Sequence, residues 1–133
     1  MSEKWEVYRE DIIPKGYYEV TNISQNGDGT KINLESEKYA IKIVFNFVDS
    51  FRATDEGRRI RTYHEIKEIQ EYRNEFIGYP LYVVEDSEYE AWVVLESAGF
   101  STDSTHYAVM TIDDIVDVVS PFPPEVTVEE IIN

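Results

Sequence analysis

The chain has 133 residues, a net charge of −15 and no cysteine. This length is enough for one hydrophobic core, so we expect residues 1–133 to form a single domain. The lack of cysteine excludes disulfides, thiolate zinc sites and cysteine nucleophiles, and the acidic charge disfavours binding to nucleic acid and anionic membranes.

The first third of the chain predicts an antiparallel meander. Residues 4–13 alternate weakly and favour a strand, with a short helix as the alternative. Residues 17–23 are rich in aromatic and β-branched side chains, which is typical of a strand. A tight turn at Asn26-Gly27 then leads into a short strand over residues 31–34.

The stretch 39–61 predicts a long hairpin. Its odd positions are apolar from Tyr39 to Phe47, so one face of a long strand would lie on the core. Asp49 interrupts this row and favours a bulge. A turn ending at Gly57 would then start a returning strand over Arg58–Arg61.

Two helices are predicted from capping signals. Thr62 and Glu65 form a capping box that opens a helix over residues 63–77. A second box, Ser87 with Glu90, opens a helix over residues 88–98 that Gly99 closes; a strand over 91–95 is the rival interpretation. Within this helix we expect Trp92 to face the core.

The remaining segments predict strands at 81–84, 106–112 and 115–120, and three prolines then end the sheet. Residues 126–132 form a tail with either one edge strand or a helical turn. The expected fold class is α+β, with a single, mainly antiparallel, twisted sheet of about six to seven strands and two helices on one face.

No recognised catalytic or ligand-binding motif is present. The two histidines, His64 and His106, lack metal-ligand spacing, and the chain has no GxSxG, Walker loop or GxGxxG sequence. We therefore predict no catalytic, cofactor-binding or metal-binding residues, and enzymatic activity is the less favoured interpretation. The opening residues lack the apolar run of a signal peptide and no apolar run spans a membrane, which favours a cytoplasmic location.

Arg52 lies on the mixed face of the long predicted strand. An ion pair with Asp55, Glu56 or Glu65 is one role for it. The alternative is a guanidinium that binds a carboxylate or phosphate. In that case the protein would be a small-molecule-binding domain or enzyme, with a pocket near Arg52, His64 and His106.

Charge is distributed unevenly along the chain. No Lys or Arg follows Arg73, whereas thirteen Asp and Glu residues do. An acidic surface attracts basic partners, so the favoured function is a non-enzymatic binding protein for a basic protein. The candidate partner-binding residues are Glu85, Asp86, Glu88, Glu90, Asp103, Asp113, Asp114 and Asp117.

The segments FRATDEGRRIRT, SEYEAWVVLESAGF and HYAVMTIDDIVDVVSPFPPEV resemble those of small acidic bacterial proteins, some of which are similar to immunity proteins of polymorphic toxin systems. The resemblance covers roughly residues 40–125 and carries no catalytic signature. It implies a non-enzymatic inhibitor of a cognate toxin. A structural or oligomerising domain is a third possibility.

Overall fold

The computed structural model describes residues 3–100 and 103–132, which form two antiparallel sheets and three α-helices. The five-stranded sheet has the order β1-β6-β7-β8-β5, and the four-stranded sheet has the order β2-β3-β4-β9. The elements are β1 (Lys4–Val7), β2 (Glu19–Asn26), β3 (Gly29–Glu35), β4 (Tyr39–Phe45), β5 (Ser50–Asp55), the 3-10 helix η1 (Glu56–Arg58), α1 (Ile60–Glu65), α2 (Lys67–Glu75), β6 (Leu81–Glu85), α3 (Glu88–Glu96), β7 (Thr105–Met110), β8 (Asp114–Ser120) and β9 (Glu125–Glu130).

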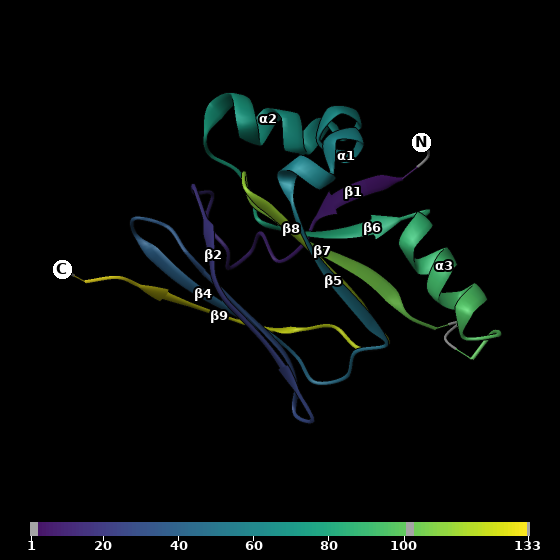
Figure 1. The fold of residues 1–133 in the computed structure, drawn as a ribbon. Coiled ribbons are helices and arrows are strands. Elements are labelled where there is room, and N and C mark those ends of the chain that lie inside the picture. Colours follow the sequence, from purple (N-terminus) through teal and green to yellow (C-terminus); the bar gives the residue numbers. More distant parts are fainter. Residues whose placement is uncertain (1–2, 101–102, 133) are drawn as a thin grey trace.

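The elements form three layers, with the five-stranded sheet between the four-stranded sheet and the helices (Figure 1). One face of this sheet packs on the four-stranded sheet, and side chains such as Phe45 and Tyr107 meet there. The other face is covered by α1 and α2 at one end and by α3 at the other. Ile115 of β8 packs with the α1–α2 cluster, and Val119 packs with α3. Asp117 lies between them on the same face, because side chains two residues apart share a face of a strand.

The α+β class and the antiparallel pairing agree with the sequence-based prediction, but the single sheet and the two-helix count were wrong. The predicted strand from Tyr39 is interrupted after Phe45, and its two halves belong to different sheets. The pattern was misleading because β4 and β5 line the same core from opposite sides, with Phe45 and Phe51 in one cluster. Phe47, which was predicted to lie on the core, is 59 % exposed in the break between them. The predicted returning strand at Arg58–Arg61 is instead the end of η1 and the start of α1.

The predicted helix over residues 63–77 is two helices with a break at Ile66, whose φ of −90° and ψ of 115° are extended. Tyr63 and Tyr72 are both buried, yet they are nine residues apart. At about 100° per residue, an unbroken helix would point them in opposite directions. The break at Ile66 therefore allows both tyrosines to face the sheet. Thr62 lies inside α1, so the predicted capping box does not open a helix.

Candidate functional site

A carboxylate is buried at the centre of the helix-covered face. Asp117 is 0 % exposed, and its neighbours on β8, Val116 and Val118, are equally buried. Asp117 was predicted to be an exposed partner-binding acid, and the structure corrects this. Isolated buried charges are unfavourable, so a buried carboxylate needs several compensating partners.

Three cationic or hydrogen-bonding side chains meet this carboxylate. Arg52 Nε donates to Asp117 Oδ2 over 2.8 Å, and Arg59 Nη1 donates to the same oxygen over 2.6 Å. The other oxygen, Oδ1, lies 2.6 Å from His106 Nε2. Both guanidinium groups are thus held by one fixed anion, which restricts their rotamers.

The charge state of Asp117 follows from these contacts. Burial alone would raise its pKa, but the hydrogen bond and electrostatic interaction with His106 and the positive charges of Arg59 and Arg52 hold the pKa below its ordinary value. The carboxylate is therefore ionised at neutral pH, and it remains the acceptor for both arginines.

His106 connects this cluster to α3. Its Nδ1 lies 2.6 Å from Ser87 Oγ, and the same Oγ accepts a bond from Glu90 N over 2.9 Å as the N-cap of α3. The Ser87 capping bond confirms the predicted start of this helix. Although Ser, His and Asp are the residues of hydrolytic triads, Ser87 is 6 % exposed and its oxygen already caps the helix. The chain of bonds is therefore structural: it fixes α3 relative to Asp117.

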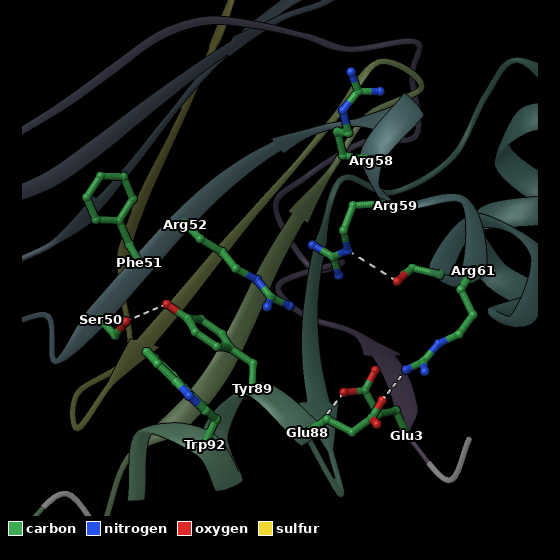
Figure 2. A pocket seen from close by; sticks show the side chains of 11 residues that line it. Glu3, Ser50, Phe51, Arg52, Arg58, Arg59, Arg61, Glu88, Tyr89 and Trp92 are labelled. Atoms are coloured by element: carbon green, nitrogen blue, oxygen red, sulfur yellow. Dashed lines mark hydrogen bonds and ion pairs between the residues drawn. The ribbon is translucent and has the colours of Figure 1, made fainter. Parts of the chain in front are cut away.

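A cavity of about 630 Å³ opens above Asp117, in the gap between α1 and α3. Figure 2 shows the guanidinium groups of Arg52 and Arg59 pointing into the same space, with Tyr89 and Trp92 beside them. Arg58 lies at the rim and points away from the aromatic pair. The lining residues come from the segment before β1, from β5, from η1 and the residue after it, and from α1 and α3: Glu3, Ser50, Phe51, Arg52, Arg58, Arg59, Arg61, Thr62, Glu88, Tyr89 and Trp92.

Tyr89 and Trp92 form the aromatic wall of the cavity, and several neighbouring side chains hold Tyr89 in place. The Arg52 guanidinium carbon lies 4.1 Å from the ring centroid of Tyr89, a cation–π distance. A hydrogen bond joins the Tyr89 hydroxyl to Ser50 Oγ, and the edge of His106 meets the ring at 5.6 Å. Trp92 stacks on Tyr89 at 6.1 Å and 17°. Trp92 was expected to face the core, but it is 52 % exposed.

The arginines have more donors than the cavity has acceptors. Arg52 uses Nε for Asp117, and among the described residues its Nη1 and Nη2 have no hydrogen-bond acceptor. Arg59 donates from Nε to Thr62 Oγ1 and from Nη1 to Asp117.

Arg61 is paired with Glu88 over 2.6 Å. Within residues 3–100 and 103–132, Arg58 makes no ion pair and donates only to the Gly57 carbonyl oxygen. These spare N–H groups define a site for an anion.

The acids on the opposite wall are already engaged. Glu88 Oε2 accepts from Arg61, and Glu3 Oε2 accepts from the backbone N–H of Glu88 over 2.9 Å. The cavity thus has a cationic side formed by Arg52 and Arg59, and an acidic side formed by Glu3 and Glu88.

The predicted pocket residues are only partly brought together. Arg52 pairs with Asp117 rather than with Asp55, Glu56 or Glu65, and His106 contacts the same carboxylate from below the cavity. His64 is exposed on α1 and lines a separate small hollow with Glu56 and Arg73.

The remaining predicted partner-binding acids divide between the two ends of the five-stranded sheet. Glu85 ends β6 next to α3, whereas Asp114 begins β8 at the other end, because Val84 pairs with His106 and Met110 pairs with Ile115. Most of this set is exposed, while Glu90 and Asp114 are half-buried: Glu85, Asp86, Glu88, Glu90, Asp103, Asp113 and Asp114. They do not form one contiguous acidic face.

Sequence reasoning missed Arg59, Arg61, Tyr89 and Asp117 as parts of one site. One signal was present: Asp117 is the single charge inside the apolar run IVDVVS. A charge in a strand that is apolar on both faces needs a buried counter-charge. The identity of that counter-charge required the cross-strand pairing.

Comparison with known proteins gives no family for this chain: no family model, no curated protein and no solved structure matches it. In the described part of the chain, no group of His, Cys, Asp and Glu side chains is arranged to hold a metal ion. No helix of residues 3–100 and 103–132 is long and apolar enough to cross a membrane.

Proposed function

We propose that this chain is a non-enzymatic binding protein whose cavity between α1 and α3 holds an anionic group, a carboxylate or a phosphate. One observation carries the proposal: Arg52 and Arg59 are both fixed by Oδ2 of the buried Asp117. Their remaining N–H groups are held ready for a second anion, so little rotamer entropy is lost on binding.

The charge of the whole molecule sharpens this proposal. Four arginines line one cavity in a protein with a net charge of −15 and only twelve Lys and Arg residues. Fields from exposed charges are screened over about 8 Å at physiological ionic strength. An anion inside the cavity therefore responds mainly to the adjacent guanidinium groups, whereas the surrounding surface repels anions.

The test is calorimetric titration with inorganic phosphate and with acetate. Arg52→Gln and Arg59→Gln each remove a guanidinium, and the loss of one charge-assisted bond is expected to weaken binding by about 10-fold or more. Arg73→Gln is the matched control, since Arg73 lies on α2 outside the cavity. Absence of saturable binding, or an equal loss in the Arg73 variant, contradicts the proposal.

A second candidate function is binding of a basic protein partner through α3, as expected for a toxin-neutralising immunity protein. The observation that favours it is an apolar surface with an acidic border. Trp92, Leu95 and Phe100 are 52 %, 79 % and 93 % exposed. The exposed acid Glu88 begins the helix, and Glu85, also exposed, ends β6 just before it. Exposed apolar groups with a polar rim are typical of protein-binding surfaces.

This second function is tested by co-expression with any toxin-like protein encoded directly upstream. A stable complex is expected, and Leu95→Glu should abolish it while Glu130→Lys on β9 leaves it intact. Charge reversal at Glu85 and Asp86 should lower the association rate. A complex that is indifferent to all α3 variants contradicts this surface assignment.

A further inference from the structure

We infer that the anion held in this cavity carries a planar aromatic ring, as a nucleoside monophosphate does. The inference rests on the proposed anion site and adds the second half of the ligand. It depends on the relation between Arg52, which the sequence placed in a pocket, and Arg59 and Tyr89, which it did not; all three meet in one cavity (Figure 2).

Arg52 joins the cationic and aromatic parts of the cavity. Its Nε is 2.8 Å from Asp117 Oδ2, and its guanidinium carbon is 4.1 Å from the Tyr89 ring centroid. A ligand whose anionic group contacts Arg52 is therefore adjacent to the aromatic pair. Trp92 is the more exposed member of that pair, and its 52 % exposure leaves apolar ring surface uncovered at the cavity wall.

The wall is rigid enough to act as a stacking platform. Tyr89 is held by Ser50, by Arg52 and by the edge of His106, so Trp92 stacks on a fixed ring. Stacking of a base on such a side chain contributes about 1–3 kcal/mol and tolerates different bases, since every base has a π face.

The acidic side of the cavity complements the polar edge of such a ligand. Glu3 and Glu88 line the side of the cavity away from Arg52 and Arg59 (Figure 2). Although Glu88 Oε2 accepts from Arg61, its Oε1 can accept a bond from a ligand. Carboxylates accept hydrogen bonds from amino and hydroxyl groups, and a nucleoside carries both on its base and sugar. An anion without donor groups would gain nothing from these acids.

The size of the cavity and the charge of the protein favour a single nucleotide over a polynucleotide as the ligand. A volume of about 630 Å³ is within the range of small-molecule sites. A polynucleotide would extend beyond the cavity over a surface that belongs to a protein with a net charge of −15. Each further phosphate there would be repelled rather than bound.

The experiment measures separately what the aromatic ring and the phosphate of the ligand contribute to affinity. The four nucleoside monophosphates, ribose 5-phosphate and adenosine are titrated by calorimetry into the intact chain. At least one monophosphate is expected to bind about 10-fold or more tighter than ribose 5-phosphate, as stacking of about 1.4 kcal/mol or more requires. Trp92→Ala should reduce that monophosphate to the affinity of ribose 5-phosphate. Leu95→Ala is the matched control, because Leu95 is exposed on the same helix and does not line the cavity.

Fluorescence provides an independent readout, because the chain has two tryptophans and Trp5 is only 4 % exposed. The bound monophosphate is expected to quench Trp92, and Trp92→Phe should keep the affinity while losing the signal. Equal affinities for every monophosphate and ribose 5-phosphate overturn the ring inference and leave the anion site standing. If none of these phosphates binds, the ring inference is overturned, and the anion site falls with it unless acetate gives saturable binding. Tighter binding of an octathymidylate than of any monophosphate overturns the commitment to a small ligand.

Discussion

Arg52 and Asp117 lie directly opposite each other on the neighbouring strands β5 and β8, 65 residues apart in the chain, and Arg52 Nε donates to Asp117 Oδ2 over 2.8 Å. Arg52 of this cross-strand ion pair lines the cavity, whereas Asp117 is fully buried. Arg59 reaches the same oxygen from the start of α1, and His106 reaches the other oxygen from β7. The site therefore depends on the pairing order β7-β8-β5.

Asp117→Asn is expected to destabilise the fold by about 3 kcal/mol, because it removes the anion that compensates two guanidinium groups and leaves Arg59, 12 % exposed, without a counter-charge. Urea unfolding at pH 7 measures the change in the free energy of unfolding. Asp113→Asn, at an exposed turn position, serves as the control and should stay within about 0.5 kcal/mol of the wild type. A loss of less than about 1 kcal/mol would show that the network contributes little.

The contribution of Asp117 has a defined pH dependence. Its pKa in the folded protein is lower than the ordinary value, so its stabilising effect is present above the unfolded pKa of about 3.9 and is lost as the pH falls through the folded pKa. The contribution of Asp117 to the difference in free energy of unfolding between wild type and Asp117→Asn should therefore decline at acidic pH, below the unfolded value. A difference that stays unchanged down to about pH 2 would contradict this assignment.

Asp114→Asn is expected to stabilise the protein at neutral pH. Asp114 lies directly opposite Asp55 on β5, and burial, followed by the charges of Asp113, Asp55 and Glu56, raises its pKa. A raised carboxyl pKa means that stability falls as the pH rises through the unfolded and folded values. Removing the charge should recover a few tenths of a kcal/mol, as for other like-charge cross-strand pairs. The gain should vanish at pH 3, when both forms are neutral; a gain that persists there would have another cause.

Gly29→Ala is expected to destabilise the β2–β3 hairpin strongly. Gly29 has a φ of +111°, and an added Cβ would lie 2.1 Å from the carbonyl oxygen of Phe45. The backbone of β4 would have to move, at a cost of about 1–3 kcal/mol or more. Gly27→Ala is the matched control in the same turn, since a Cβ there has no neighbour within 4 Å. Thermal unfolding of the two variants distinguishes them, and equal melting temperatures would contradict the prediction.

The parts of the fold that local patterns determine were predictable. A turn follows β2 as predicted, although its two loop residues are Gly27 and Asp28 rather than Asn26 and Gly27, since Asn26 pairs with Gly29. Ser87 caps α3 as its box indicated. The strands predicted at 81–84, 106–112 and 115–120 begin and end within one or two residues of the observed β6, β7 and β8. Periodicity reports which side chains are buried, but it does not report which sheet a strand joins. This is why the strand from Tyr39 was extended across a boundary between sheets.

The site was less predictable because its contacts are non-local. Asp117 was grouped with the acids after Arg73 by charge alone, whereas its burial arises from packing between the two ends of the helix-covered face. The helix break at Ile66 illustrates the same limit. The spacing of Tyr63 and Tyr72 already conflicted with an unbroken helix, but the conformation of Ile66 followed from both tyrosines meeting the sheet.

The two sheets are interleaved along the chain, and this has a consequence for folding speed. β9 pairs with β4 in the four-stranded sheet, although β5, β6, β7 and β8 lie between them in the sequence. In the same way, β1 pairs with β6, although β2, β3, β4 and β5 lie between them in the sequence. Both pairings close long loops before they bring stabilising contacts, which slows folding. We expect neither sheet to form alone as a stable fragment, and the main refolding phase after dilution from urea should fall on the millisecond-to-second scale typical of non-local β topologies.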